Sequence, residues 1–177
     1  VQPRKNYQML VQAFAPIADQ FPHDLAIAGG KGWMVDEMIN EAHHLGIGDR
    51  VHFLGFVADE DLPALYSASS LFVMPSIYEG FGLPILEAMA CAVPVIISNI
   101  SSLPEVAGNA AVQLPADDPD AWTAAMSEIL NDENRRAEMA EAGRIQARRF
   151  SWRQAADELL AVYDALLDKE ATSRHNY

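Results

Sequence analysis

The stretch "LFVMPSIYEGFGLPILEAMACAVPVIIS", residues 71–98, holds two strand patterns with a helix pattern between them. The apolar runs at 71–75 and 94–98 are short and bounded by proline and serine, which is typical of buried strands. Residues 83–91 have a helical composition with Pro84 in the first turn, where the missing N–H of proline is not needed. Strands that are joined through a helix lie parallel in a sheet, so this stretch predicts an α/β fold.

The same alternation of strand and helix patterns extends to both sides of this stretch. Strand patterns lie at 24–30 and 50–56, and helix patterns lie at 5–21, 33–46 and 59–68. Because crossovers between parallel strands are right-handed, this alternation builds a sheet that is covered by helices on both faces. We therefore predict a Rossmann-like, doubly wound parallel sheet.

The last third of the chain predicts extra C-terminal helices. Asp118 before a proline is an N-cap pattern, and Ser151 with Gln154 is a capping-box pattern. We predict one domain over residues 1–168, followed by a polar tail at 169–177. An apolar stripe on the last helix requires a surface to cover it, and its members are Leu159, Leu160, Tyr163, Leu166 and Leu167.

The sequence enters its first helix pattern, at 5–21, almost at once. A doubly wound sheet begins with a strand whose carboxyl end leads into the first helix, and no strand pattern precedes this one. We therefore interpret the chain as the second half of a longer polypeptide, with an N-terminal domain and a first strand upstream.

Composition argues against several classes of partner. The 12 Lys and Arg residues face 25 Asp and Glu residues, for a net charge of −13 without a basic patch, so no nucleic-acid partner is expected. No apolar run reaches the ~20 residues that a membrane-spanning helix needs. Cys91 is the only cysteine, which excludes an intrachain disulfide and favours a reducing compartment. We predict a cytoplasmic protein that contacts the inner membrane only peripherally, through the missing half.

The loop "SIYEGFGL", residues 76–83, is a candidate ligand site. It follows the carboxyl end of a predicted strand, where open α/β sheets bind ligands. Gly80 and Gly82 allow a tight turn and let a ligand approach the backbone. The amides of Phe81, Gly82 and Leu83 are then expected to point outward at the positive end of a helix, where an anion such as a diphosphate binds.

Two glutamates lie on either side of this turn. Glu87 lies one turn into the helix, and its side chain leans toward the helix N-terminus, where it can accept both hydrogens of a vicinal diol such as a ribose. Glu79 precedes the turn and can accept from hydroxyls on the other side of the phosphates, where a donor hexose fits. The simpler alternative is that Glu87 complements the helix dipole and that Glu79 is an ordinary loop acid.

Glu79 and Glu87, with seven residues between them and "GFGLPILEAMA" around them, resemble the signature of the retaining glycosyltransferases of family 4. These enzymes have the GT-B architecture of two Rossmann-like domains. The resemblance extends over nearly the whole chain and is to the C-terminal, donor-binding domain of that family. The segments that carry it are "PRKN", "RVHFLGF", "LPALYSAS", "PSIYEGFGLPILEAMACAVPVI", "SSLPEVAG" and "RFSW".

The resemblance implies a role for individual residues. Lys5 matches the lysine that contacts phosphate in the family, although it can also be an ordinary surface lysine. Glu79 and Lys5 are then the catalytic residues, the backbone of Gly80 to Leu83 holds the hexose and the diphosphate, and Glu87 holds the ribose. The family often has a phosphate-binding arginine upstream of the stretch printed here, and Arg4 is not the matching position.

Two further segments are implied to line the site. Phe56 and Val57 match the place of the nucleobase, but packing of Phe56 in the core is an equally good account. Gly30, together with Gly29 and Gly32, lies in another loop at the sheet edge, where glycine can also serve only to enter a helix.

The implied function is transfer of a hexose from a nucleoside diphosphate sugar to a hydroxyl acceptor. "RKN", "GW" and "SSLPEVAG" look most like the mannosyltransferase branch that builds bacterial surface polysaccharides, so GDP-mannose is the predicted donor. The acceptor is a glycan or a lipid-linked glycan that binds through the missing N-terminal domain, and the fragment alone is expected to be inactive. No cofactor is expected, and no metal, because such enzymes usually use Lys, Arg and a helix end in its place.

Two alternatives stay open at this point. A GT-B epimerase that acts on nucleotide sugars shares the fold and part of the site, and its catalytic acids would lie in the missing half. A non-enzymatic flavodoxin-like or receiver-type binding domain shares the alternation of strands and helices. A receiver, however, needs an acid cluster at the ends of its early strands, and "DLAIAGG" at 24–30 offers none.

Overall fold

The computed structural model describes the backbone of residues 2–30 and 35–174, and the side chains of these residues as far as 167. The chain divides into two compact units, Val1–Ala147 and Arg148–Tyr177. The first unit contains the strands and the candidate site, and the second contains one long helix. The predicted single domain over residues 1–168 stays a prediction.

In the described residues of the first unit, five strands form two parallel sheets. Strands β1 (Leu25–Ala28) and β2 (Val51–Gly55) pair with each other, and β3 (Phe72–Met74), β4 (Val95–Ser98) and β5 (Val112–Leu114) form the second sheet in that order. The predicted α/β class with parallel strands is confirmed. The strands are divided between two sheets, however, whereas the sequence predicted a single one.

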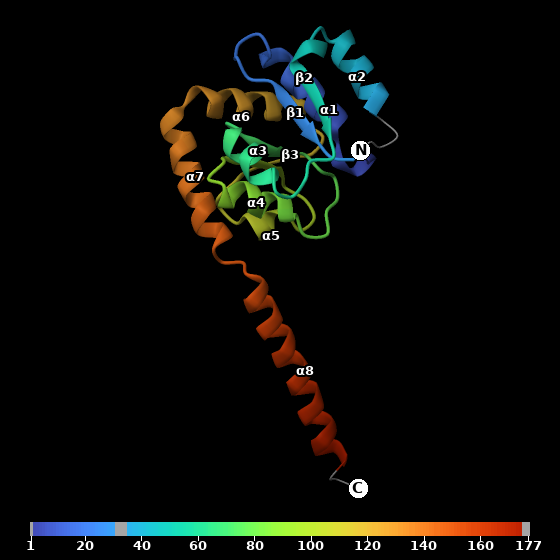
Figure 1. Ribbon diagram of the computed structural model, residues 1–177, viewed down its shortest axis with the longest axis vertical. Coiled ribbons are helices and arrows are strands. Elements are labelled where there is room, and N and C mark those ends of the chain that lie inside the picture. The colour runs from blue at the N-terminus through green and yellow to red at the C-terminus, as the bar shows by residue number, and fades with distance from the viewer. Residues whose placement is uncertain (1, 31–34, 175–177) are drawn as a thin grey trace. The chain divides into compact units, whose positions relative to one another are not determined.

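Helices connect the strands and pack against them (Figure 1). In chain order they are α1 (Tyr7–Phe14), α2 (Val35–His44), α3 (Leu62–Ala68), α4 (Leu83–Ala90), α5 (Leu103–Ala107), α6 (Pro119–Asn131) and α7 (Glu133–Ala147), with 3-10 helices at Pro3–Lys5 (η1), Ala15–Ile17 (η2) and Gly48–Arg50 (η3). The first helix pattern, at 5–21, is broken because Pro16 lacks the N–H that would continue α1, and the chain tightens into η2 there.

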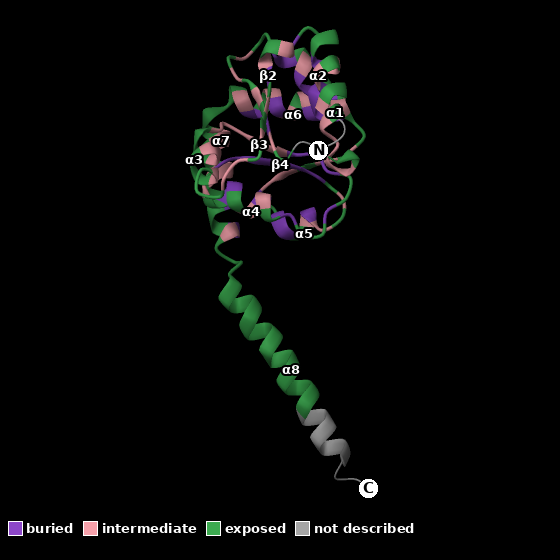
Figure 2. Cartoon of the chain, turned by 45° about the vertical axis from the view of Figure 1, so that its right-hand side comes forward, coloured by how far each residue is buried: buried purple, intermediate pink, exposed green. Residues whose placement is uncertain are grey.

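The core of the first unit consists of two hydrophobic clusters. One surrounds Trp122, which is fully buried and donates from its indole Nε1 to the carbonyl of Pro115 at 2.7 Å. The other lies between α4, β4 and α5, and it includes Ile85, Ile97 and Leu103. Figure 2 shows buried residues on α4 and α5 and on the strand next to them. This second cluster fixes the position of α4, whose first turn adjoins the candidate site.

The second unit contains α8 (Trp152–Arg174). Ser151 accepts from the amide of Gln154 at 3.1 Å, as the capping-box pattern predicts, but the Gln154 side chain donates to Glu158 at 2.8 Å and so does not close the box. The apolar residues of the predicted stripe are exposed, and what covers them stays a prediction; they are Leu159, Leu160, Tyr163, Leu166 and Leu167. Across the described parts of the chain, no helix combines the length and the apolar character that membrane crossing requires.

Candidate functional site

The loop between β3 and α4 turns on a single glycine. Gly82 is the N-cap of α4 and has φ +102, a left-handed conformation that side chains other than hydrogen rarely adopt. A Cβ atom at this position would lie 2.9 Å from Cδ2 of Leu103, so the end of that side chain would have to shift. Gly80 differs, because a Cβ there would meet no atom within 4 Å. The sequence predicted both glycines for the turn, and only Gly82 is required by the fold.

Glu79 lies in this loop and is buried, with 8% of its surface exposed. Its two carboxylate oxygens are held separately: Oε1 accepts from Lys5 Nζ at 2.6 Å, and Oε2 accepts from Arg4 Nη1 at 2.8 Å. Ser76, which is also buried, donates to Oε1 at 2.9 Å. Glu79 and Lys5 were predicted separately as site residues, and in the structure they are in direct contact.

The 3-10 helix η1 contains Arg4 and Lys5, the two cationic residues that contact Glu79. Asn6 follows η1 in a left-handed conformation, with φ +57, and its side-chain amide donates to the carbonyls of Pro75 at 3.2 Å and Ala116 at 2.7 Å. The carbonyl of Arg4 also accepts from the amide of Ile77 at 2.8 Å. These contacts fasten the N-terminal segment to the loop after β3. As a result, residues more than 70 positions apart share one site.

The electrostatics of this cluster favour an ionised Glu79. Partial burial raises the pKa of the carboxyl, but the hydrogen bonds from Lys5, Ser76 and Arg4 outweigh it, and the net result is a pKa below the ordinary value. Glu79 is therefore a carboxylate at neutral pH, with two cationic partners. The same carboxylate and the burial of Tyr7 together raise the pKa of the Tyr7 phenol, with burial the larger cause.

Three of the residues that contact Glu79 were not assigned a role from the sequence. Arg4 was set aside because it does not occupy the family's arginine position, yet it contacts Glu79 directly. Ser76 was passed over although it lies two residues after the end of β3 and three residues before Glu79. Ser101 comes from the loop after β4, and its hydroxyl contacts the Glu79 backbone. All three lie in segments that carry the family resemblance, but nothing in the sequence indicated that they contact Glu79.

Glu87 is exposed and has a different kind of partner. Tyr66 on α3 donates its hydroxyl to Oε2 of Glu87 at 2.9 Å, and its ring packs edge-on against Phe72 at 5.6 Å between centroids. Burial and then the hydrogen bond to Glu87 raise the pKa of the Tyr66 phenol, so it stays a donor at neutral pH. Tyr66 therefore shares the carboxylate with any diol that binds there, and the contact of Glu87 with a ribose stays a prediction.

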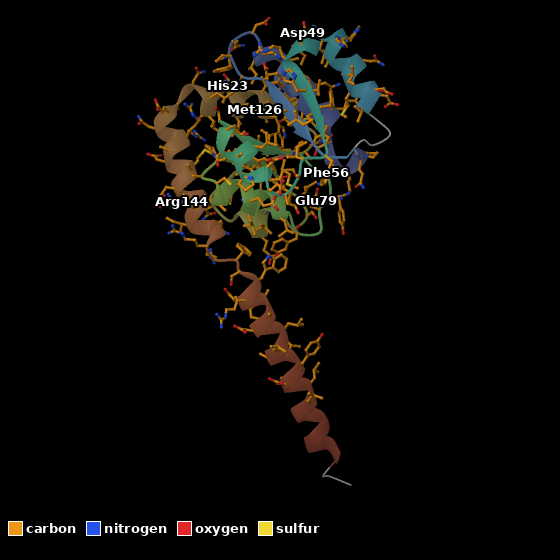
Figure 3. The ribbon with its side chains drawn as sticks, viewed as in Figure 1. His23, Asp49, Phe56, Glu79, Met126 and Arg144 are labelled. Carbon is orange, nitrogen blue, oxygen red and sulfur yellow. The ribbon has the colours of Figure 1, made fainter. Side chains whose placement is uncertain are left out.

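The remaining predicted residues lie on loops at strand ends. Phe56 directly follows β2 and is 80% exposed, so the alternative of core packing is wrong. Val57 beside it is half-buried. Gly30 follows β1 and is exposed, while Gly32 lies outside the described residues. Figure 3 labels Phe56 and Glu79, which lie on the same side of the first unit in that view.

The start of α4 is suited to an anion. Its N-cap, the left-handed Gly82, makes no side-chain cap hydrogen bond, and its first turn contains a proline. Within the described parts of the chain, no group of three or more His, Cys, Asp or Glu side chains has the arrangement of a metal site. The site thus combines a helix N-terminus, two cations and two carboxylates.

Comparisons with known proteins show the family of the chain. The family described as Glycosyl transferases group 1 matches residues 1–146. The chain is 41% identical over 169 residues to an O-antigen chain mannosyltransferase B of Escherichia coli, which covers 94% of this chain and 44% of that protein. It is 36% identical over 189 residues to a D-inositol 3-phosphate glycosyltransferase of Salinispora tropica, covering 99% and 38%. The chain thus spans less than half the length of these curated relatives.

Solved structures show the same fold. The sucrose-phosphate synthase of Thermosynechococcus elongatus is 31% identical, with a TM-score of 0.83 over 95% of this chain and 44% of that one. Anabaena Alr3699/HepE in complex with UDP and glucose also gives a TM-score of 0.83, over 93% of this chain and 46% of that one, at 24% identity. The C-terminal domain of a group 1 glycosyl transferase from Francisella tularensis gives 0.74 over 84% and 80%, at 24% identity.

Proposed function

The chain belongs to the glycosyl transferases group 1, and we propose on this premise that the loop before α4 binds the nucleotide-sugar donor of a retaining hexosyl transfer. The observation that carries the proposal is the buried Glu79 carboxylate, held by Lys5 and Arg4 directly before the start of α4. A buried ionised acid with shared cationic partners is typical of a site that orients a polar substrate. Since the chain spans less than half of its relatives, the complete transfer is proposed for a longer protein.

The cations are placed to serve the diphosphate as well as Glu79. The side chains of Lys5 and Arg4 keep 25% and 40% of their surface exposed, so each can turn a second N–H donor toward an incoming anion. In the transfer, the bond between the anomeric carbon and the diphosphate oxygen breaks, and its electron pair stays on the diphosphate. The anomeric carbon forms a new bond to the acceptor's hydroxyl oxygen, and the hydroxyl proton passes to the departing diphosphate. Lys5, Arg4 and the N-terminus of α4 stabilise that charge. We assign no nucleophile within this chain.

The two glutamates have separate roles in this proposal. Glu79 accepts from the hydroxyls of the hexose and fixes its orientation relative to the phosphates. Glu87 accepts from the ribose through the oxygen that Tyr66 leaves open, since Oε2 already accepts from the phenol. Phe56, which is exposed after β2, and Val57 are proposed to contact the base, and Gly30 lies in the neighbouring loop.

The proposed donor is GDP-mannose and the proposed acceptor is a glycan or a lipid-linked glycan. The support for mannose comes from the relative named an O-antigen chain mannosyltransferase, which is 41% identical to this chain. The lysine, the arginine and the helix N-terminus can neutralise a diphosphate without a divalent ion, so we propose donor binding without metal.

Calorimetric titration of the 177-residue chain with a panel of nucleoside diphosphates and nucleoside diphosphate sugars tests the proposal. GDP-mannose is expected to bind more tightly than UDP-glucose, and EDTA is expected to change its affinity by less than about twofold, well under the ~1.4 kcal/mol of a tenfold change. Absence of binding by every nucleotide of the panel would contradict donor binding. Tighter binding of UDP-glucose would contradict only the assignment of the donor, and a strict metal requirement only the metal-independent site.

A further inference from the structure

Ser101 adopts an unfavourable backbone conformation at the edge of the site. Its φ is +58, in the left-handed region where glycine is comfortable and residues with a Cβ are strained. In the described chain two other residues that are not glycine share this conformation, Asn6 with φ +57 and Ala92 with φ +59. Asn6 is a residue type that tolerates the region and uses its side chain as an anchor. The presence of a serine at position 101, where glycine would be unstrained, therefore needs a physical explanation.

The hydroxyl of Ser101 holds the main chain of Glu79 from both sides. It accepts from the Glu79 amide at 3.2 Å and donates to the Glu79 carbonyl at 2.5 Å. Ser102 adds its own hydroxyl, which lies 3.1 Å from the same carbonyl and 3.1 Å from the carbonyl of Phe81. The loop after β4 is thus hydrogen-bonded to the loop after β3 at Glu79, whose carboxylate contacts Lys5 and Arg4.

A third hydroxyl, on Ser98, also joins β4 to the loop after β3. Ser98, the last residue of β4, is fully buried and donates to the carbonyl of Ser76 at 2.5 Å. Ser76 in turn donates to the Glu79 carboxylate. Both the backbone and the side chain of Glu79 are therefore fixed by hydroxyls, and Ser101 is the one among them that sits in a strained conformation.

We propose that Ser101 is a positioning residue for the donor site, whose hydroxyl fixes the Glu79 backbone so that the carboxylate meets the donor sugar in one orientation. The inference rests on the proposed function, in which Glu79 orients the hexose. Glycine at this position would relieve the strain and lose the hydroxyl. A position that mattered only for loop conformation would be served better by glycine.

Two substitutions of Ser101 distinguish the effect of its hydroxyl from the effect of its backbone strain. Ser101→Gly removes both, whereas Ser101→Ala removes the hydroxyl and keeps the strain, so only the alanine variant should melt clearly below the wild type. The control is Ala92→Gly, which relieves a similar strain in the turn after the far end of α4. Ala92→Gly is expected to bind the donor as the wild type does.

The deciding readout is the affinity for the intact donor compared with the bare nucleoside diphosphate. Both Ser101 variants are expected to bind GDP-mannose about tenfold more weakly and GDP within about twofold of wild type, because only the sugar meets Glu79. Combined with Glu79→Gln, Ser101→Gly is expected to add little further loss, since it acts through Glu79.

The outcomes distinguish the inference from its premise. If Glu79→Gln weakens GDP-mannose binding and Ser101→Gly does not, the positioning role is wrong and the proposed function stands. If Ser101→Gly weakens GDP and GDP-mannose equally, the serine supports the loop as a whole, and the positioning role is again wrong. If Glu79→Gln leaves GDP-mannose binding unchanged, the proposed function itself fails, and the inference fails with it.

Discussion

Glu79 and Glu87 lie on either side of the first turn of α4, and the protein holds them in opposite ways. Glu79 is buried and its carboxylate accepts from Lys5, Arg4 and Ser76. Glu87 is exposed, and the described contact of its carboxylate is the one with Tyr66. A group with several fixed donors has its orientation set by the fold before any ligand arrives.

This difference in hydrogen-bond partners implies that the two carboxylates accept different parts of a ligand with different freedom to adjust. A sugar that binds at Glu79 must fit an orientation already set by two cations and a serine. A ribose at Glu87 meets a carboxylate with one oxygen open to solvent, which can adjust by small rotations. We therefore expect substitutions near Glu79 to affect folding and binding together, and substitutions near Glu87 to affect binding alone.

The largest expected effect comes from the turn that separates the two glutamates. Gly82→Ala places a Cβ 2.9 Å from Leu103 in a backbone with φ +102, so we expect it to lower the free energy of unfolding by about 2–4 kcal/mol. Urea denaturation measures this loss. Gly80→Ala is the matched control, because its Cβ would meet open space, and its loss is expected to stay under about 1 kcal/mol. Equal losses in both variants would contradict the special role of Gly82.

The next effect concerns ligand affinity at the exposed glutamate. Glu87→Gln keeps size and helix propensity but removes the charge that strengthens a hydrogen bond to a ribose, so we expect the affinity for the bare nucleoside diphosphate to fall by ~1.5–3 kcal/mol. Calorimetric titration measures it. The free energy of unfolding should change by less than about 0.5 kcal/mol, because the side chain is exposed. An unchanged affinity would favour the simpler account, in which Glu87 only complements the helix dipole.

Much of this architecture was predictable because it depends on local patterns. Strands β3 and β4 and the turn before α4 follow from apolar runs and from glycine and proline at fixed places. The contacts that hold Glu79 were not predictable, because Arg4 and Ser101 reach it from segments 75 and 22 positions away. No hydrophobic period or residue spacing in the sequence indicates a contact between segments so far apart. The division of the strands into two sheets is likewise a property of the packed chain.

The stability that Glu79 contributes is expected to depend on pH. Its pKa is lowered in the folded protein from the ordinary value of 4.5, so the unfolded chain binds the proton more tightly. The contribution is therefore fully present above about pH 4.5, and it is lost as pH falls through the lower pKa of the folded state. At pH 7, Glu79→Gln is expected to lower the free energy of unfolding by about 1–3 kcal/mol, a range reduced for the partial exposure of Lys5 and Arg4.

Denaturation of the wild type and of Glu79→Gln at several pH values tests this dependence. The difference between the two should shrink steadily below about pH 4.5, because protonation gives the wild type a neutral side chain as well. Gly80→Ala serves as the control and should show no such trend, because it removes no titratable group. A gap between wild type and Glu79→Gln that stays constant down to acid pH would show that Glu79 is not held by its charge.

The smallest expected effect comes from the single partner of Glu87. Tyr66→Phe removes the hydroxyl that donates to Oε2 but keeps the ring that packs against Phe72, so the fold should be preserved. Without that donor the carboxylate can rotate, and we expect the affinity for the nucleoside diphosphate to fall by about 0.5–1.5 kcal/mol, the value of one hydrogen bond. The 2′-deoxy form of the same nucleotide is the informative probe. If Tyr66 aims the carboxylate at the ribose diol, the wild type prefers the ribose form and Tyr66→Phe loses part of that preference. An equal fall for the ribose and deoxyribose forms would show that Tyr66 supports the helix pair α3 and α4 without directing Glu87.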